Sequence, residues 1–222
     1  GRGIKASTDV DKMACCANAK ETRMTINAYF QWLKRDWAKA GFILSIFLFN
    51  FLFTFVREAD FVIFILLLQT PLYMLHETEE YIFPGGFAKF FNTKIFKLET
   101  EDKPLDEDFI FYVNIALVWI LLPACGLLAI NDYNFGLWIP YFSIFAGVNH
   151  IALGIKAGQF YNPGLFISLI INIPVGLWSV FYLMGQGVLE NFLNIHFVIG
   201  LAVNGIVPIM GVVLLRKYLA KR

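Results

Sequence analysis

The chain has 222 residues, of which 58% are hydrophobic and 16% are charged. Soluble domains are nearer half apolar and a quarter charged, so this composition argues against a soluble fold, and repeated apolar runs of about 20 residues are typical of membrane-spanning helices. The net charge of +1, without a run rich in Lys and Arg and without a base-stacking motif, excludes nucleic acid as an expected partner.

Residues 1–40 are predicted to form a polar tail followed by a juxtamembrane amphipathic segment. The first 23 residues lack the apolar core of about 7 to 15 residues that a signal peptide needs. Aromatic residues at positions 29, 30 and 32 are then followed by the basic residues Lys34, Arg35 and Lys39. Residues 41–222 are predicted to form a single transmembrane domain.

Apolar segments separated by polar turns predict six membrane spans. They cover about residues 41–56, 61–83, 109–130, 135–157, 165–184 and 192–215. Between the second and third spans, residues 87–96 alternate aromatic side chains with lysines, which indicates a short interfacial helix. The hydrophilic residues 98–108 then predict a loop in water. The sequence therefore predicts an all-α, polytopic transmembrane helix bundle of about six spans, an integral membrane protein whose first partner is the lipid bilayer.

The charges of the loops predict the orientation of the bundle. Six spans place both termini on one side, and the segments predicted on that side carry most of the basic residues: Lys89, Lys94, Lys97, Lys103, Lys156, Arg216, Lys217, Lys221 and Arg222. The opposite loops carry only Arg57. By the positive-inside rule both termini are expected to be cytoplasmic, or to face the matrix or stroma of an organelle.

The second predicted span ends in the ionisable residues His76, Glu77, Glu79 and Glu80. A histidine followed by glutamates three and four positions later presents all three side chains on one helical face. Ionisable groups inside a span are costly unless they pair, face a cavity or bind a metal, so such a group predicts a functional site. The alternative is a set of solvated charges at the helix end.

Depth in the membrane relates this group to a second histidine. If the second span begins near Asp60, a rise of about 1.5 Å per residue places His76 about 24 Å along it. His150 lies about 22 Å along the fourth span by the same rise. The two histidines are therefore expected at the same depth.

Several polar residues of other spans are expected near this depth. Asn114, Ser168 and Asn204 are predicted to converge on one cavity in the inner leaflet, and Asn149 adjoins His150. The asparagines Asn114, Asn149 and Asn204 are candidates for cofactor-binding or oxyanion-binding donors, and the alternative for each is interhelical hydrogen bonding. His196 is predicted nearer the outer face, as an interfacial or packed histidine.

Two histidines and two carboxylates form a ligand set suited to zinc or non-haem iron. The predicted ligands of this divalent metal are His76, Glu79, Glu80 and His150, with Glu80 and Glu79 as catalytic residues. The expected protein is a metal-dependent membrane hydrolase or oxidoreductase that acts on a hydrophobic small molecule or lipid. A metal-free hydrolase, with one glutamate as general base and His150 as its partner, is an alternative.

A further alternative belongs to a different class of protein. Aromatic residues make up 17% of the chain, and its three histidines are available as axial ligands. These features favour an accessory subunit of a larger membrane complex, or a component that binds a cofactor or pigment.

Five motifs occur in order along the chain. They are His76-Glu77-Thr78-Glu79-Glu80-Tyr81, Pro84-Gly85-Gly86-Phe87, Val113-Asn114, Asn149-His150 with Gly154, and Tyr161-Asn162-Pro163-Gly164-Leu165 with Pro174. Over about residues 61–182 this set resembles the HXXEE-motif family of small membrane proteins. The function of that family is unknown, so the resemblance implies a metal-type or acid/base-type site rather than a reaction. Carried over by motif, the site residues are His76, Glu79, Glu80, Asn149 and His150.

The chain also shows a looser likeness to the CAAX-processing type of intramembrane protease, which has paired glutamates and separate histidines. That family has an arginine four positions after its second glutamate. Here the corresponding residue is Pro84.

Overall fold

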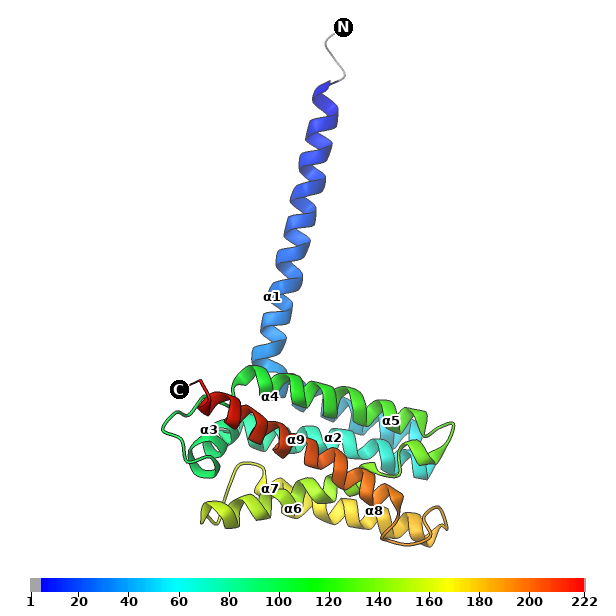
Figure 1. The fold of residues 1–222 in the computed structure, drawn as a ribbon. Helices are drawn as coiled ribbons and strands as arrows, with labels where there is room; N and C mark the ends of the chain where they lie inside the picture. The colour runs from blue at the N-terminus through cyan, green and yellow to red at the C-terminus, as the bar shows by residue number, and fades with distance from the viewer. Residues whose placement is uncertain (1–4, 222) are drawn as a thin grey trace. The chain divides into compact units, whose positions relative to one another are not determined.

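A computed structural model describes residues 5–221 of the chain, with side chains from residue 25 onward, and contains only helices and loops in that part (Figure 1). Residues 1–4 and 222 of the predicted tail and C-terminus lie outside the described residues. The first helix, α1 (Lys5–Phe51), contains a non-helical residue, Asp36. No glycine or proline occurs between Lys5 and Ala40, so this polar segment can continue the helix. The chain divides into two compact units, Gly1–Trp37 and Ala38–Arg222.

The predicted all-α bundle of about six spans is confirmed. Within the described residues, six helical segments are long and apolar enough to cross a membrane: Thr25–Val56, Phe61–Tyr81, Glu107–Leu128, Tyr133–Ala157, Leu165–Gly185 and Ile195–Leu219. They fit a membrane protein. The last five agree with the predicted spans to within a few residues, whereas the first helix begins well before the predicted residue 41. The cytoplasmic location of both termini stays a prediction.

Of the six spans among the described residues, the third and the fifth are interrupted by π-helical segments, the first ends in one, and the other three each contain one long α-helix. The elements are η1 (Leu52–Val56), α2 (Phe61–Tyr81), α4 (Glu107–Asn114), η3 (Ile115–Leu121), α5 (Leu122–Leu128), η4 (Tyr133–Phe135), α6 (Ile139–Ala157), α7 (Leu165–Ile167), η5 (Ser168–Asn172), α8 (Ile173–Gly185) and α9 (Ile195–Leu219). The π-helical segments η3 and η5 lie just before Pro123 and Pro174. A proline lacks an N–H group and its ring clashes with the carbonyl four residues earlier, which widens the preceding turn.

A short helical element follows α2, where the sequence predicted a short helix, and its interfacial position stays a prediction. It consists of α3 (Phe87–Phe90) and the π-helical segment η2 (Phe91–Ile95). The buried Asn92 side chain fixes the loop that follows, since its Nδ2 donates to the carbonyl oxygens of Glu101 and Leu105 and its Oδ1 accepts from the Leu105 N–H. Phe90 and Phe91 of this element are buried in one apolar cluster with Phe109 and Leu153.

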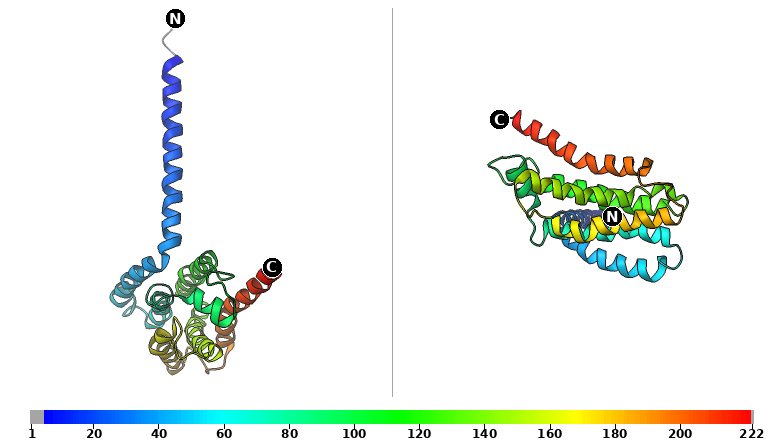
Figure 2. Two further views of the ribbon diagram at one scale, coloured as in Figure 1. Left: turned by 90° about the vertical axis from the view of Figure 1, so that its left-hand side faces the viewer. Right: turned by 90° about the horizontal axis from the view of Figure 1, so that it is seen from below.

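Within the second unit, helices α2, α4, α6, α8 and α9 lie roughly along one direction (Figures 1 and 2). Helix α2 is the most buried span among the described residues: 72% of its most apolar stretch is buried inside the protein, compared with 17% for α9. Helix α2 packs on α5 and α6, and α6 packs on α8 and α9. Glycines permit the close approach of these helices, because a Cβ on Gly176 or Gly200 would lie 2.9 Å from a carbonyl oxygen of α6 or its N-cap residue, Trp138. Helices α8 and α9 thus pack closely on α6, which also lies against α2.

Candidate metal centre

The C-terminal halves of α2 and α6 carry the candidate ligands. Helix α2 begins where the Asp60 side chain accepts from the Ile63 N–H, and it ends at Tyr81, before Pro84. Helix α6 ends at Ala157, and the next residue, Gly158, has a φ of +64°, a conformation that favours glycine after a helix. Both helices therefore present their histidines in the last turns, where the sequence predicted them.

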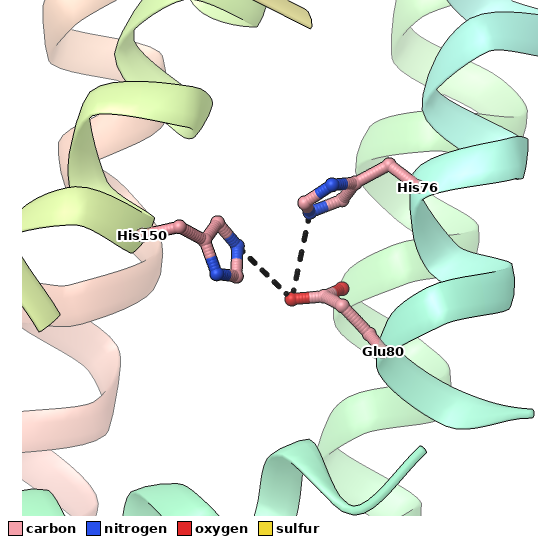
Figure 3. Close-up of side chains that lie close together, drawn as sticks. All are labelled: His76, Glu80 and His150. Carbon is pink, nitrogen blue, oxygen red and sulfur yellow. Dashed lines mark ion pairs between the residues drawn. The ribbon is translucent and has the colours of Figure 1, made fainter. Parts of the chain in front are cut away.

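His76, Glu80 and His150 form a buried group of side chains that point toward one another (Figure 3). His76 Nε2 lies 3.6 Å from Glu80 Oε1, and His150 Nε2 lies 3.3 Å from the same oxygen. The two imidazole rings have their centroids 4.7 Å apart, and the ligand atoms of all three residues lie within 4.8 Å of one another. The structure thus brings together the two histidines and one of the two predicted glutamates.

The spacing of these atoms is compatible with a metal ion. A charge-assisted N–H···O⁻ hydrogen bond is about 2.7–2.9 Å long. The edge of a tetrahedron with metal–ligand bonds of about 2.0–2.2 Å is about 3.3–3.6 Å, and the two nitrogen–oxygen distances are 3.3 and 3.6 Å. Both ring nitrogens of the fully buried His76 find no hydrogen-bond partner among the described residues. Two histidines and one carboxylate are the ligand set of catalytic zinc sites and of non-haem iron sites with open positions.

Asn162 fixes the orientation and tautomer of His150. Its Nδ2 donates to the His150 backbone carbonyl over 2.9 Å, and its Oδ1 lies 2.9 Å from His150 Nδ1. Because the amide nitrogen is used by the backbone, the amide oxygen faces the ring and His150 Nδ1 must be the donor. The lone pair of Nε2 is then free to bind a metal ion, and such a partner on the second ring nitrogen is typical of metal-binding histidines.

Gly164 lies directly beside the imidazole rings of His76 and His150. Its φ is +97°, and a Cβ built on it would lie 2.4 Å from His150 Cε1 and 2.8 Å from His76 Cε1. A glycine is required here both by the backbone conformation and by the space. Asn162 and Gly164 were not predicted as site residues, although both lie in the Tyr161–Leu165 motif quoted above.

Glu79, a predicted ligand and catalytic residue, is not brought into this group. Its Oε1 accepts from the Tyr161 hydroxyl over 2.9 Å and from the Phe166 N–H over 3.0 Å, and its Oε2 accepts from the Ile167 N–H over 2.7 Å. The first N–H groups of a helix have no partner within it and attract negative charge. Glu79 therefore caps the start of the fifth span, whose own N-cap residue, Gly164, has no side chain to do so.

Tyr161 completes this cap from the loop between α6 and α7. Burial and the hydrogen bond to the Glu79 carboxylate raise the pKa of Tyr161 above its ordinary value. The phenol therefore stays protonated at physiological pH and remains a donor to Glu79.

An apolar cavity of about 210 Å³ opens beside the group. Glu80 and His150 line it, together with all three predicted asparagines, Asn114, Asn149 and Asn204. Most of its other walls are aromatic or aliphatic side chains: Tyr73, Phe87, Phe91, Phe109, Phe142, Val113, Leu117 and Val207. One side of the candidate metal centre therefore faces an apolar space with a few polar groups.

Other ionisable and polar residues near this depth lie outside the group. Glu77 is fully buried, and Trp119 Nε1 donates to its Oε2 over 3.4 Å. The buried hydroxyl of Ser168 does not line the cavity beside Glu80. His196 lies in the first turn of α9, where its N–H donates to Asn194 Oδ1, and is no part of the group, in line with the expectation of a packed histidine.

The sequence of the chain matches one known protein family. A family model described as "Protein of unknown function with HXXEE motif" matches residues 67–179, more than half of the chain. Neither curated proteins nor solved structures give a match.

Proposed function

The chain belongs to the family of proteins of unknown function with an HXXEE motif, and the segment His76–Glu80 is that motif in this chain. We propose that His76 and Glu80 of the motif, together with His150, bind one divalent transition metal. The protein is then a metal-dependent membrane enzyme, a hydrolase or an oxidoreductase, that acts on a hydrophobic or lipid-like substrate. The match of the family model confirms the predicted family, but membership of this family implies no particular reaction.

One observation carries the proposal: His76, Glu80 and His150 converge from two helices at the wall of an apolar cavity. A structural metal site is closed by four protein ligands, whereas a catalytic site keeps a position open. Here three protein ligands are available among the described residues, and two of them, Glu80 and His150, also line the cavity.

The residues of the chain have separate tasks in this proposal. His76, Glu80 and His150 would hold the ion. The bound ion would act as a Lewis acid toward a substrate in the cavity. Asn162 keeps the Nε2 lone pair of His150 directed at the ion. The aromatic wall of the cavity excludes bulk water, which strengthens the electrostatic interactions of the site.

Elemental analysis of the purified full-length chain tests the proposal. We expect about one zinc or iron ion per chain, and loss of most of it in His76→Ala, Glu80→Gln and His150→Ala, because removing one ligand of three leaves a weak site. His196→Ala and Glu58→Gln are matched controls that remove a histidine and a glutamate outside the group, and they should retain the ion. Wild-type chain without bound metal, whose thermal stability also does not respond to a chelator, would contradict the proposal.

The metal-free enzyme is the second candidate, because Glu80 and His150 are buried neighbours that both line the cavity. In that reading Glu80 is the general base and His150 its partner. Wild-type chain would then contain no stoichiometric metal, and Glu80→Gln would leave the thermal stability and the metal content unchanged while abolishing turnover.

A further inference from the structure

The cavity contains a polar pair formed across two helices. Asn149 of α6 and Asn204 of α9 are hydrogen-bonded to each other, with Asn149 Nδ2 as donor and Asn204 Oδ1 as acceptor. This bond leaves the carbonyl oxygen of Asn149 and the amide nitrogen of Asn204 available. If both amides were turned over, the pair would still offer one acceptor and one donor.

The position of the pair points to a ligand. Asn204 is only 6% exposed, yet it lines the cavity together with Asn149 and His150. The free donor and acceptor of this pair are accessible from the cavity, where a ligand or water can complete their hydrogen bonds. Asn114 adds a second acceptor on the same cavity, because its Nδ2 donates to the Ile110 carbonyl over 2.9 Å and to the Tyr81 hydroxyl over 3.3 Å.

The size of the cavity restricts the part of a ligand that it takes. Pockets that enclose a whole drug-sized ligand have volumes of about 300–1,000 Å³, and this cavity has about 210 Å³. Three of its lining residues, Ala152, Lys156 and Pro208, are also exposed on the surface of α6 and α9. The head of an amphiphile can therefore lie inside, while its alkyl chain lies against the apolar helices or in the bilayer.

We propose that Asn149 and Asn204 form a subsite for the amide group of a long-chain amphiphile, such as a fatty amide. An amide has both a donor N–H and an acceptor carbonyl, which match the acceptor of Asn149 and the donor of Asn204. An ester of the same length has only the acceptor, so it leaves the Asn149 carbonyl without a partner. The assignment of this subsite to a substrate rests on the proposed function, whereas the amide binding itself does not require the metal.

A comparison of two probes tests the subsite in the full-length chain in lipid nanodiscs. Dodecanamide and methyl dodecanoate have chains of the same length but differ in the N–H group. We expect the amide to bind about tenfold more tightly, the effect of about one buried hydrogen bond. Asn149→Leu removes the acceptor of the N–H group, so it should reduce the affinity for the amide to that for the ester, while the donor of Asn204 remains for the carbonyl of both probes.

Two controls keep the test decisive. Asn149→Leu/Asn204→Leu replaces both polar groups by apolar ones, so no amide is left unpaired and the bundle stays folded; it should show the same loss of preference. Asn50→Leu removes an exposed asparagine of α1 that bonds only within its helix, and it should keep the preference. Equal affinity of the wild-type chain for both probes, or an equal loss of both in the double variant, overturns the inference.

The metal-ligand variant Glu80→Gln separates this inference from the proposed function. A preference for the amide that persists in Glu80→Gln supports the subsite, whatever the metal content of the wild-type chain. Metal binding without any preference overturns the subsite alone, and preference without metal overturns the proposed function alone.

Discussion

Glu79 and Glu80 are adjacent in sequence but have different partners. Neighbouring residues of an α-helix point about 100° apart, so adjacent side chains face different neighbours. Glu80 faces the imidazoles of His76 and His150, whereas Glu79 faces the first N–H groups of the fifth span. One turn of α2 thus serves the candidate metal centre and the attachment of another helix.

At the residue scale, Gly164→Ala should disturb the histidines. The new Cβ would lie 2.4 Å from His150 Cε1, so the ring must move, in addition to the strain of a φ of +97°. We expect a destabilisation of more than about 1 kcal/mol and a clear loss of bound metal, measured by thermal unfolding and elemental analysis.

Gly86→Ala is the matched control for this substitution. Gly86 has a φ of +90° and no atom within 4 Å of an added Cβ. It should cost only about 1 kcal/mol of backbone strain and keep its metal. Equal effects of the two substitutions on the bound metal would show that Gly164 has no specific role beside the histidines.

The part of the site that could be predicted from sequence is the part that depends on helical spacing. His76 and Glu80 share a face, and the equal depth of His76 and His150 follows from the rise of the helix. The separation of Glu79 from Glu80 could not be predicted, because the partners of Glu79 include backbone N–H groups that no residue type marks. Asn162 could have been suspected, since it lies in a short loop only 12 residues after His150.

At the scale of the element, the start of the fifth span depends on a carboxylate from α2. Glu79→Ala should leave the N–H groups of Phe166 and Ile167 without their acceptor and lower the stability by about 1–3 kcal/mol without changing the metal content. Thermal unfolding and elemental analysis measure the two effects, with the exposed Glu58→Ala as control. Loss of metal at unchanged stability would instead make Glu79 a ligand, as the sequence first suggested.

The spans were predictable because long apolar runs mark them, and their ends because Pro84, Gly158 and similar breakers follow them. The interruptions η3 and η5 were not predicted. Pro123 and Pro174 were a signal for them, since each proline displaces the carbonyl four residues earlier, that of Trp119 or Ile170. The helical extension before residue 41 was missed because a polar composition does not by itself stop a helix.

At the scale of the whole molecule, the charges of the loops predict that both termini face the cytoplasm. A cysteine at Glu99, between the second and third spans, should be protected from a membrane-impermeant maleimide in intact cells. A cysteine at Asn131, between the third and fourth spans, should react. The background for both is the chain with Cys15, Cys16 and Cys125 replaced by serine, and permeabilised cells are the control for reactivity. Labelling of residue 99 but not 131 would reverse the orientation.

The cap that Glu79 places on the fifth span has a consequence for biogenesis. A chain is synthesised from its N-terminus, so His76 and both carboxylates leave the ribosome before His150, and Asn162 and Gly164 come later still. In the complete fold the fifth span is attached to α2 through Glu79, and the loop before this span contains Asn162, which orients His150. If the site binds a metal ion as proposed, the ion is therefore expected to bind late in assembly, and a chain truncated after its fourth span would contain His76, Glu80 and His150 but not Asn162 or Gly164.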